Sequence, residues 1–274
     1  MAEVSISTRT IIARCDWFVN DLQVFYDLIN TNPAGGYGEI LYVKYKECSK
    51  GDSGKKHSLK SFLNSMTLVV DIGEKKINVK VFTNGSRQLT GCKSMEQAIK
   101  TLEVLWTRLL AIEREYEVSL CTFYDKRKKY GTGILSTVMV DISYNFGYEF
   151  NLTAVNTLIN NMPGYQTFYE AMLSNGVKIT VHEGEIGPDE IMPWARFEPD
   201  GSVDSYEDVI SSYVNNPLIP SNSKKSLLKA KNKNITFMVF SSGKVMVSGS
   251  TLNRMLIAVE NLKKIFDENS IVRF

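Results

Sequence analysis

Residues 77–91 and 235–249 each have the pattern of a strand, a tight turn and a second strand. Successive side chains of a strand point to opposite faces, so the regularly apolar positions should pack on helices and the alternate positions should face outward. Phenylalanine, methionine, lysine and hydroxyl side chains together suit a binding surface, because exposed apolar patches mark interaction sites. The alternative is that a second sheet or an insertion covers them. The expected outward side chains are Asn78, Lys80, Phe82, Gln88, Thr90, Thr236, Met238, Phe240, Met246 and Ser248.

The two segments indicate an internal duplication. Phe82 matches Phe240, Gly85 matches Gly243 and Gly91 matches Gly249, all at an offset of 158. An amphipathic helix follows each segment at helical spacing, and we expect the same offset to extend into it. The apolar stripes are Ala98, Leu102, Leu105, Leu109 and Ile112 in one helix, and Met255, Val259, Leu262 and Phe266 in the other.

Each half of the chain is predicted to contain a strand, a short helix, further strands and a long helix. Adjacent strands imply an antiparallel sheet with helices on one face, in an α+β fold. We expect a first domain at 1–132 with a basic loop insertion at 47–66, and a second at 133–274 with an acidic insertion at 184–223. Further expected elements are strands 8–15, 40–45, 67–72, 136–143, 168–173 and 177–181, a helix at 17–29 capped by Asp16, a long helix opened by Ser94, and a helix at 151–161.

The segment at 239–249, Val-Phe-Ser-Ser-Gly-Lys-Val-Met-Val-Ser-Gly, resembles the strand–turn–strand signature of the TATA-box-binding protein family. That family carries the signature twice, and residues 81–91 form a looser first copy here. The chain is similar to the divergent versions of this protein in large DNA viruses. The resemblance implies a saddle of two pseudo-symmetric repeats, with one curved antiparallel sheet and helices on its convex face.

The resemblance also implies roles for individual residues. Phe82 and Phe240 would each be a wedge inserted between base steps of a bent DNA duplex. Thr90 and Ser248 match small hydroxyl residues before glycine, and Lys244 matches a turn lysine near a phosphate. The implied DNA-binding set is Phe82, Phe240, Tyr37, Tyr165, Lys80, Gln88, Thr90, Met238, Lys244, Met246 and Ser248, with the two tyrosines as a second aromatic in each repeat.

Three departures from the family bear on target recognition. The family has an asparagine in the first strand of each repeat, where Thr10 and Thr137 occupy the region here. Lys80 stands where the family has an apolar groove contact, and Ser86 replaces the turn lysine in the first copy. The long acidic insertion is a further addition.

The implied function is a non-enzymatic transcription initiation factor. It would bind and bend A/T-rich double-stranded promoter DNA and recruit RNA polymerase or other initiation factors. It would act as a monomer without cofactor, metal or membrane, in the nucleus, a viral factory or the virion. The alternative is a protein-interaction scaffold of the same fold without autonomous DNA binding. Catalysis is disfavoured because the chain has only two histidines and lacks the common nucleophile and phosphate-binding motifs.

Charge is distributed unevenly along the chain. Residues 183–208 hold nine acidic residues and one arginine, a charge of −8, so the net +2 leaves +10 for the remainder. A basic body suits a polyanionic partner, whereas the acidic segment fits either a solvated loop or a partner site. The lysines of 50–60 fit either a solvated loop or a phosphate contact, and the basic run Lys126–Lys129 fits a solvated linker, a phosphate contact or a targeting signal. One hypothesis is autoinhibition, in which deleting 184–222 would strengthen DNA binding.

Overall fold

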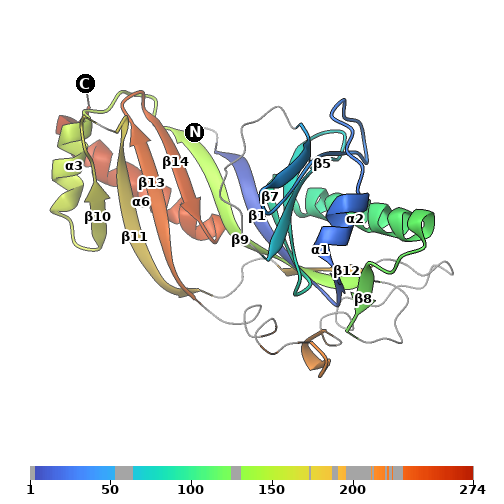
Figure 1. Ribbon diagram of the computed structural model, residues 1–274. Helices are drawn as coiled ribbons and strands as arrows, with labels where there is room; N and C mark the ends of the chain where they lie inside the picture. Colours follow the sequence, from blue (N-terminus) through green and yellow to red (C-terminus); the bar gives the residue numbers. More distant parts are fainter. Residues whose placement is uncertain are drawn as a thin grey trace. The chain divides into compact units, whose positions relative to one another are not determined.

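A computed structural model describes residues 4–52, 64–124, 131–172, 174–186, 191–195, 211, 213–219, 221, 224 and 231–273 (Figure 1). The expected basic sites at Lys55, Lys56, His57, Lys60 and Lys126–Lys129 lie outside these residues, as does most of the acidic insertion. Among the helices in the described ranges, none combines the length and the apolar character needed to cross a bilayer.

The first repeat contains a strand, a short helix, a group of strands and a long helix. Its sheet has the strand order β1-β7-β6-β5-β3-β4, and β7–β6, β6–β5, β5–β3 and β3–β4 pair antiparallel. The elements are β1 (Ser5–Cys15), α1 (Leu22–Leu28), β3 (Ile40–Tyr45), β4 (Cys48–Gly51), β5 (Ser65–Asp71), β6 (Lys76–Phe82), β7 (Ser86–Cys92) and α2 (Met95–Tyr116).

The second repeat has the same sequence of elements. Its strands have the order β9-β14-β13-β11-β10, and all neighbours are antiparallel. A separate two-stranded sheet is formed by β2 (Trp17–Val19) and β8 (Cys121–Phe123). The elements are β9 (Thr132–Asn145), α3 (Leu152–Asn160), β10 (Tyr165–Phe168), β11 (Gly176–Ile186), β13 (Lys231–Phe240), β14 (Lys244–Gly249), α6 (Leu252–Glu268) and a final 3₁₀ turn (Ser270–Val272).

The strand order confirms the duplication. The five shared strands of the first repeat are β1, β3, β5, β6 and β7, and those of the second are β9, β10, β11, β13 and β14. Counted along the chain, both sets have the order first, fifth, fourth, third, second. The predicted α+β class with two antiparallel repeats is therefore confirmed.

Each repeat buries the apolar side of its own strands against its own helices. In the second repeat Phe237 and Val239 of β13 pack with Val259 and Phe266 of α6, and all four are buried. Figure 1 shows α6 behind β11, β13 and β14. In the first repeat Val79 and Val81 are buried with the residues of α1 and α2. We call the opposite side of each sheet its outer face.

The two long helices follow a different offset from the hairpins before them. The buried positions 98, 102, 105 and 109 of α2 match 255, 259, 262 and 266 of α6 at an offset of 157. Gly91 is separated from Met95 by three residues, whereas two residues separate Gly249 from Leu252. The expected single offset of 158 is therefore wrong for the helix, because the second connection is one residue shorter. The predicted cap is confirmed: Ser94 Oγ accepts a hydrogen bond from the Gln97 amide at 3.4 Å.

Several predicted boundaries are wrong. Trp17–Val19 forms a strand, and α1 begins at Leu22 with Asp21 as its N-cap. Asp16 is instead buried and accepts a hydrogen bond from the Thr132 amide at 2.9 Å. The expected strand at 168–173 is replaced by β10, which ends at Phe168. Part of the loop expected at 47–66 is an edge strand, β4, paired with β3.

From Ile191 onward, the described part of the acidic insertion belongs to the compact unit that contains most of the first repeat. Strand β12 (Ile191–Ala195) pairs with the start of β9, and the buried side chains of Tyr213 and Ile219 pack on Ile134. The chain divides into two compact units, 1–9 with 137–189 and 228–274, and 10–136 with 190–227. This division differs from the predicted domains because β1 and β9 each carry residues of both units and because the insertion returns to the first repeat.

One glycine in each hairpin turn has a backbone conformation that other residues rarely adopt. Gly85 and Gly243 have φ angles of +77° and +82°. A Cβ atom on Gly85 would lie 2.9 Å from the Cys15 carbonyl oxygen, and one on Gly243 would collide with that of Tyr148. Each turn therefore requires glycine for its conformation and for the close approach of a neighbouring backbone.

We predict that Gly243→Ala lowers the free energy of unfolding by about 2 kcal/mol or more, combining left-handed backbone strain with a backbone collision. Gly164→Ala is the matched control, because Gly164 has a φ of +85° and nothing within 4 Å of the added Cβ. Urea unfolding of both variants measures the difference. Equal losses would show that the contact with Tyr148 contributes nothing.

Candidate nucleic-acid interface

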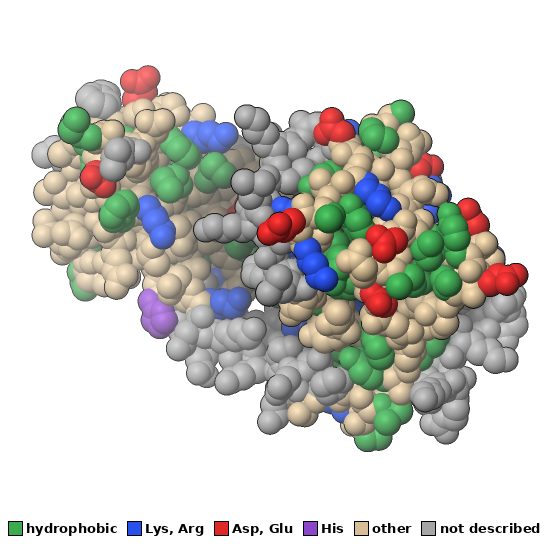
Figure 2. All heavy atoms as spheres, in the orientation of Figure 1, with side chains coloured by type: hydrophobic (Ala, Val, Ile, Leu, Met, Phe, Trp, Pro, Cys, Tyr) green, Lys and Arg blue, Asp and Glu red, His purple; other side chains and the backbone are tan. Residues whose placement is uncertain are grey.

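A row of side chains crosses the outer face of the second repeat. Its members are opposite one another in successive strand pairs, so they lie on one face. Phe168 is 64% exposed and Met246 is 41% exposed, which is unusual for large apolar residues in a sheet. Figure 2 shows hydrophobic side chains among lysine and arginine side chains on this face. The row consists of Phe168, Lys178, Met238, Met246 and Ser143.

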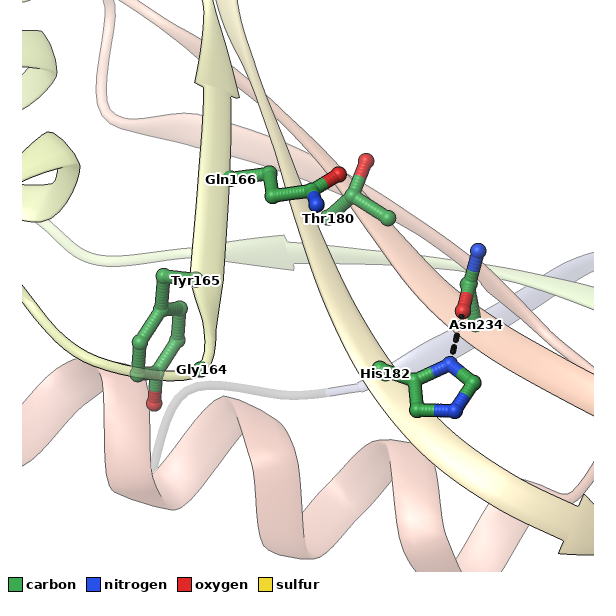
Figure 3. Close-up of a pocket in the computed structure, with 6 residues that line it drawn as sticks. All are labelled: Gly164, Tyr165, Gln166, Thr180, His182 and Asn234. Carbon is green, nitrogen blue, oxygen red and sulfur yellow. Dashed lines mark hydrogen bonds between the residues drawn. The ribbon is translucent and has the colours of Figure 1, made fainter.

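The next row on the same face is polar. The Ser248 hydroxyl donates to Asp141 Oδ1 at 2.5 Å. At the edge of this face a cavity of about 280 Å³ is lined by Gln166, Thr180, His182 and Asn234, with His182 Nδ1 2.9 Å from Asn234 Oδ1 (Figure 3). The row consists of Gln166, Thr180, Thr236, Ser248 and Asp141.

Phe240 lies at the end of β13, directly before the turn, and is half-buried. Its register partner on β11 is Gly176. A Cβ atom at Gly176 would lie 3.3 Å from both Phe240 Cδ1 and Met238 Sδ. The two side chains therefore lie over this glycine, whose lack of a side chain makes room for them on the outer face.

The outer face of the first repeat has different chemistry in the equivalent rows. The row through Lys80 contains Lys44, Thr67 and Gln88, so it has two lysines where the second repeat has Phe168 and Met238. The row through Asn78 contains Tyr42, Val69 and Thr90. Tyr42 and Val69 are buried together with Leu41, which removes their apolar surface from solvent.

The turn that follows Phe82 is held by a buried cation. The Arg87 guanidinium donates to the carbonyl oxygens of Trp17 and Gly85 at 2.9 and 2.5 Å, and it stacks over the Trp17 ring at 3.5 Å. Burial raises the pKa of the adjacent Cys15 thiol to about 11, although Arg87 opposes this shift. In the second repeat Val245 occupies the position of Arg87, so this polar anchor belongs to the first repeat alone.

Nine of the eleven residues implied by the resemblance lie on the outer faces. Lys80 and Gln88 are direct partners, as are Met238 and Met246, and Lys244 is exposed opposite Asn145. The nine are Phe82, Phe240, Lys80, Gln88, Thr90, Met238, Lys244, Met246 and Ser248.

The structure places the two tyrosines elsewhere. Tyr37 is 66% exposed in the loop before β3, next to Gly73 and at the opposite end of the hairpin from Phe82. Tyr165 pairs with Val181 and packs with the second-repeat core, where burial raises its pKa. Figure 3 shows its ring on the side away from Gln166 and Thr180. The expected DNA-facing placement of Tyr165 is therefore wrong, because the strand begins at Tyr165 instead of residue 168 and its pairing with Val181 turns this side chain toward the core.

The sequence analysis missed several outer-face residues, among them Phe168, Lys178 and Asp141. Phe168 was expected to begin a strand, whereas it ends β10 and faces outward. Lys178 lies within a correctly predicted strand, and its alternation with Val177 and Ile179 was sufficient to place it outward. Asp141 was missed because only the pairing of β9 with β14 decides which side chains of β9 face outward.

The register of β9 follows from two matching backbone hydrogen bonds. The Cys15 amide donates to the Gly85 carbonyl, and the Phe146 amide donates to the Gly243 carbonyl, each at 3.0 Å. Cys15 and Phe146 are therefore equivalent, and counting back five residues makes Asp141 the counterpart of Thr10. Thr137 does not occupy that position.

Comparisons with known proteins found two similarities. No protein-family model matches the chain. A segment of 59 residues is 42% identical to a protein of Acanthamoeba polyphaga mimivirus named "TATA-box-binding protein-like". This alignment covers 19% of the chain and 16% of the mimivirus protein. The chain is similar to the TATA-box-binding proteins.

A solved structure also resembles this chain. The TBP of Methanococcus jannaschii aligns with a TM-score of 0.48 and 14% identity, over 97% of this chain and 99% of that one. The predicted resemblance to a divergent viral member of the family is confirmed by the mimivirus match. The outer faces offer exposed or half-buried apolar side chains, hydroxyl groups and lysines. In the ranges that the structure describes, three or more metal-ligating side chains do not converge anywhere.

Tyr165 and Phe168 provide a test of the strand faces. We predict that Tyr165→Ala lowers the free energy of unfolding by about 1–3 kcal/mol, because the ring packs with the core. Phe168→Ala should change it by less than about 0.5 kcal/mol, because its ring is exposed. Chemical denaturation measures both. A larger loss for Phe168→Ala would contradict the observed register.

Proposed function

We propose that this protein is a transcription initiation factor of the TATA-box-binding type that binds A/T-rich DNA through its outer faces. The observation that carries the proposal is the row of Phe168, Lys178, Met238 and Met246 on the outer face of the second repeat. Phe240 lies next to this row, two residues after Met238 on β13. Apolar side chains on a sheet insert between base steps from the minor groove and kink the duplex. Lysines within the same rows neutralise phosphates.

Phe82 and Phe240 are the wedges in this proposal. They end the two matching strands and precede matching glycine turns. Unstacking costs least at flexible TA steps, so wedge insertion favours A/T-rich sites without many base-specific hydrogen bonds. Recruitment of RNA polymerase or other initiation factors completes the proposal, and it rests on the family resemblance.

The wedge role predicts loss of bending in a double variant. We expect Phe82→Ala/Phe240→Ala to weaken binding to an A/T-rich duplex by at least about tenfold, or 1.4 kcal/mol, and to abolish the shortening of its end-to-end distance. Fluorescence transfer between labelled duplex ends measures both. Ile257→Ala is the control, because Ile257 is 55% exposed on α6.

Binding with unchanged bending in the double variant would remove the wedge role. Failure of folded wild-type protein to bind any duplex at low salt would favour an interaction scaffold. A pull-down of RNA polymerase subunits would then test that alternative.

The lysines predict how binding responds to salt. Removing one phosphate contact reduces the slope of log affinity against log salt concentration by about 1. We expect this reduction for Lys244→Ala, whose side chain is exposed on the outer face. Lys264→Ala is the control, because Lys264 is exposed on α6 and lies 4.0 Å from Glu268. Equal slopes for both variants would place the DNA elsewhere.

A further inference from the structure

Asp141 is an acidic side chain of β9 on the outer face of the second repeat, which is proposed to contact DNA. Its register partner is Ser248, and both residues belong to the polar row on the outer face of the second repeat. The neighbouring positions 140 and 142 face the core and are buried. Because successive side chains of a strand alternate, Asp141 points to the outer face. Its side chain is half-buried there.

The Asp141–Ser248 pair presents only hydrogen-bond acceptors. A serine hydroxyl has a single proton, and Ser248 Oγ donates it to Asp141 Oδ1 at 2.5 Å. An ionised carboxylate has no proton to donate. Asp141 Oδ2 accepts no hydrogen bond from the residues that the structure describes. An approaching partner therefore meets lone pairs on both side chains.

The equivalent pair of the first repeat has the opposite capacity. Thr10 is the counterpart of Asp141 through the matching turn hydrogen bonds, and Thr90 is the counterpart of Ser248 at the hairpin offset. Each threonine carries a hydroxyl proton that can be donated to an acceptor; Thr90 is exposed, and Thr10 beside it is 6% exposed. The two repeats therefore differ at the same topological position, with hydroxyl donors in one and acceptors in the other.

The minor groove distinguishes these two chemistries. A·T and T·A pairs present only the acceptors adenine N3 and thymine O2, whereas a G·C pair adds the guanine N2 amino donor. Against an A·T pair, the acceptor oxygens of Asp141 and Ser248 would face the acceptors adenine N3 and thymine O2, and their lone pairs would repel. Against a G·C pair, the same oxygens would accept a hydrogen bond from the guanine amino group. The first-repeat threonines match A·T instead.

We propose that Asp141, with Ser248, selects a base pair with a purine 2-amino group at one position of the A/T-rich site. The inference rests on the proposed function and deepens it, since it names the base pair that this part of the surface takes. The target is then asymmetric, with an amino-bearing pair under the second repeat and A·T pairs under the first. Because the two ends of such a target differ, the protein would bind the duplex in one of its two possible orientations.

Modified bases isolate the amino group. Starting from an A/T-rich duplex that binds, each position is replaced in turn by G·C, by inosine·C, which lacks the amino group, and by 2,6-diaminopurine·T, which adds it to an A·T pair. We expect one position at which G·C and diaminopurine·T bind roughly tenfold more tightly than A·T and inosine·C, the size of a base-pair mismatch. Equal affinity of the four duplexes at every position would overturn the inference while leaving the proposed function intact.

Variants assign the preference to Asp141. Asp141→Asn supplies an amide donor, so it should bind A·T and inosine·C at that position as tightly as G·C. Glu260→Gln removes the same charge from an exposed position on α6 and should keep the wild-type preference. Thermal unfolding confirms that each variant is folded.

A preference that survives Asp141→Asn in folded protein would overturn the role of this residue. A preference lost equally in Glu260→Gln would show that net charge, and not the placed carboxylate, is responsible. Absence of binding by folded wild-type protein to all duplexes at low salt would overturn the proposed function and this inference together.

Discussion

The register of the two hairpins is the constraint on which the rest of the structure depends. A slip of one residue in an antiparallel pair moves every side chain of the strand to the other face. Gly85 and Gly243 set this register, because each has a positive φ and lies against a neighbouring carbonyl oxygen. With the turns fixed, Val79 and Phe237 enter the cores.

The same register gives the outer faces their chemistry. Once the core positions are apolar, the alternate positions are free to carry function, and the duplication supplies two copies of that arrangement. The copies have diverged: Lys44 and Lys80 in the first repeat correspond to Phe168 and Met238 in the second. One repeat offers charge in this row, and the other offers exposed apolar surface beside a single lysine, so the two repeats make different contacts with any shared partner.

Support beneath the outer faces also differs between the repeats. In the first, the buried Arg87 guanidinium donates hydrogen bonds to two carbonyl oxygens and stacks on the Trp17 ring. In the second, Gly176 leaves room for Phe240 and Met238. A buried guanidinium fixes a turn through directional hydrogen bonds, whereas a glycine only leaves room for the side chains above it. The acidic insertion adds a third difference, since β12 and Tyr213 belong to the compact unit of residues 10–136 although the insertion interrupts the second repeat.

The sequence by itself determined the features that depend on local periodicity. Alternation placed Phe82, Lys80, Met238 and Met246 outward, and helical spacing identified the buried stripe of α6, because both patterns span only a few residues. The hairpin signature also pointed to the family. Only the tertiary structure decided which residues of distant strands lie opposite one another. The hydrogen bond from Phe146 to Gly243 made Asp141 the counterpart of Thr10, and pairing with β11 turned Tyr165 inward and Phe168 outward. Such pairings join residues up to about a hundred positions apart, and no local pattern specifies them.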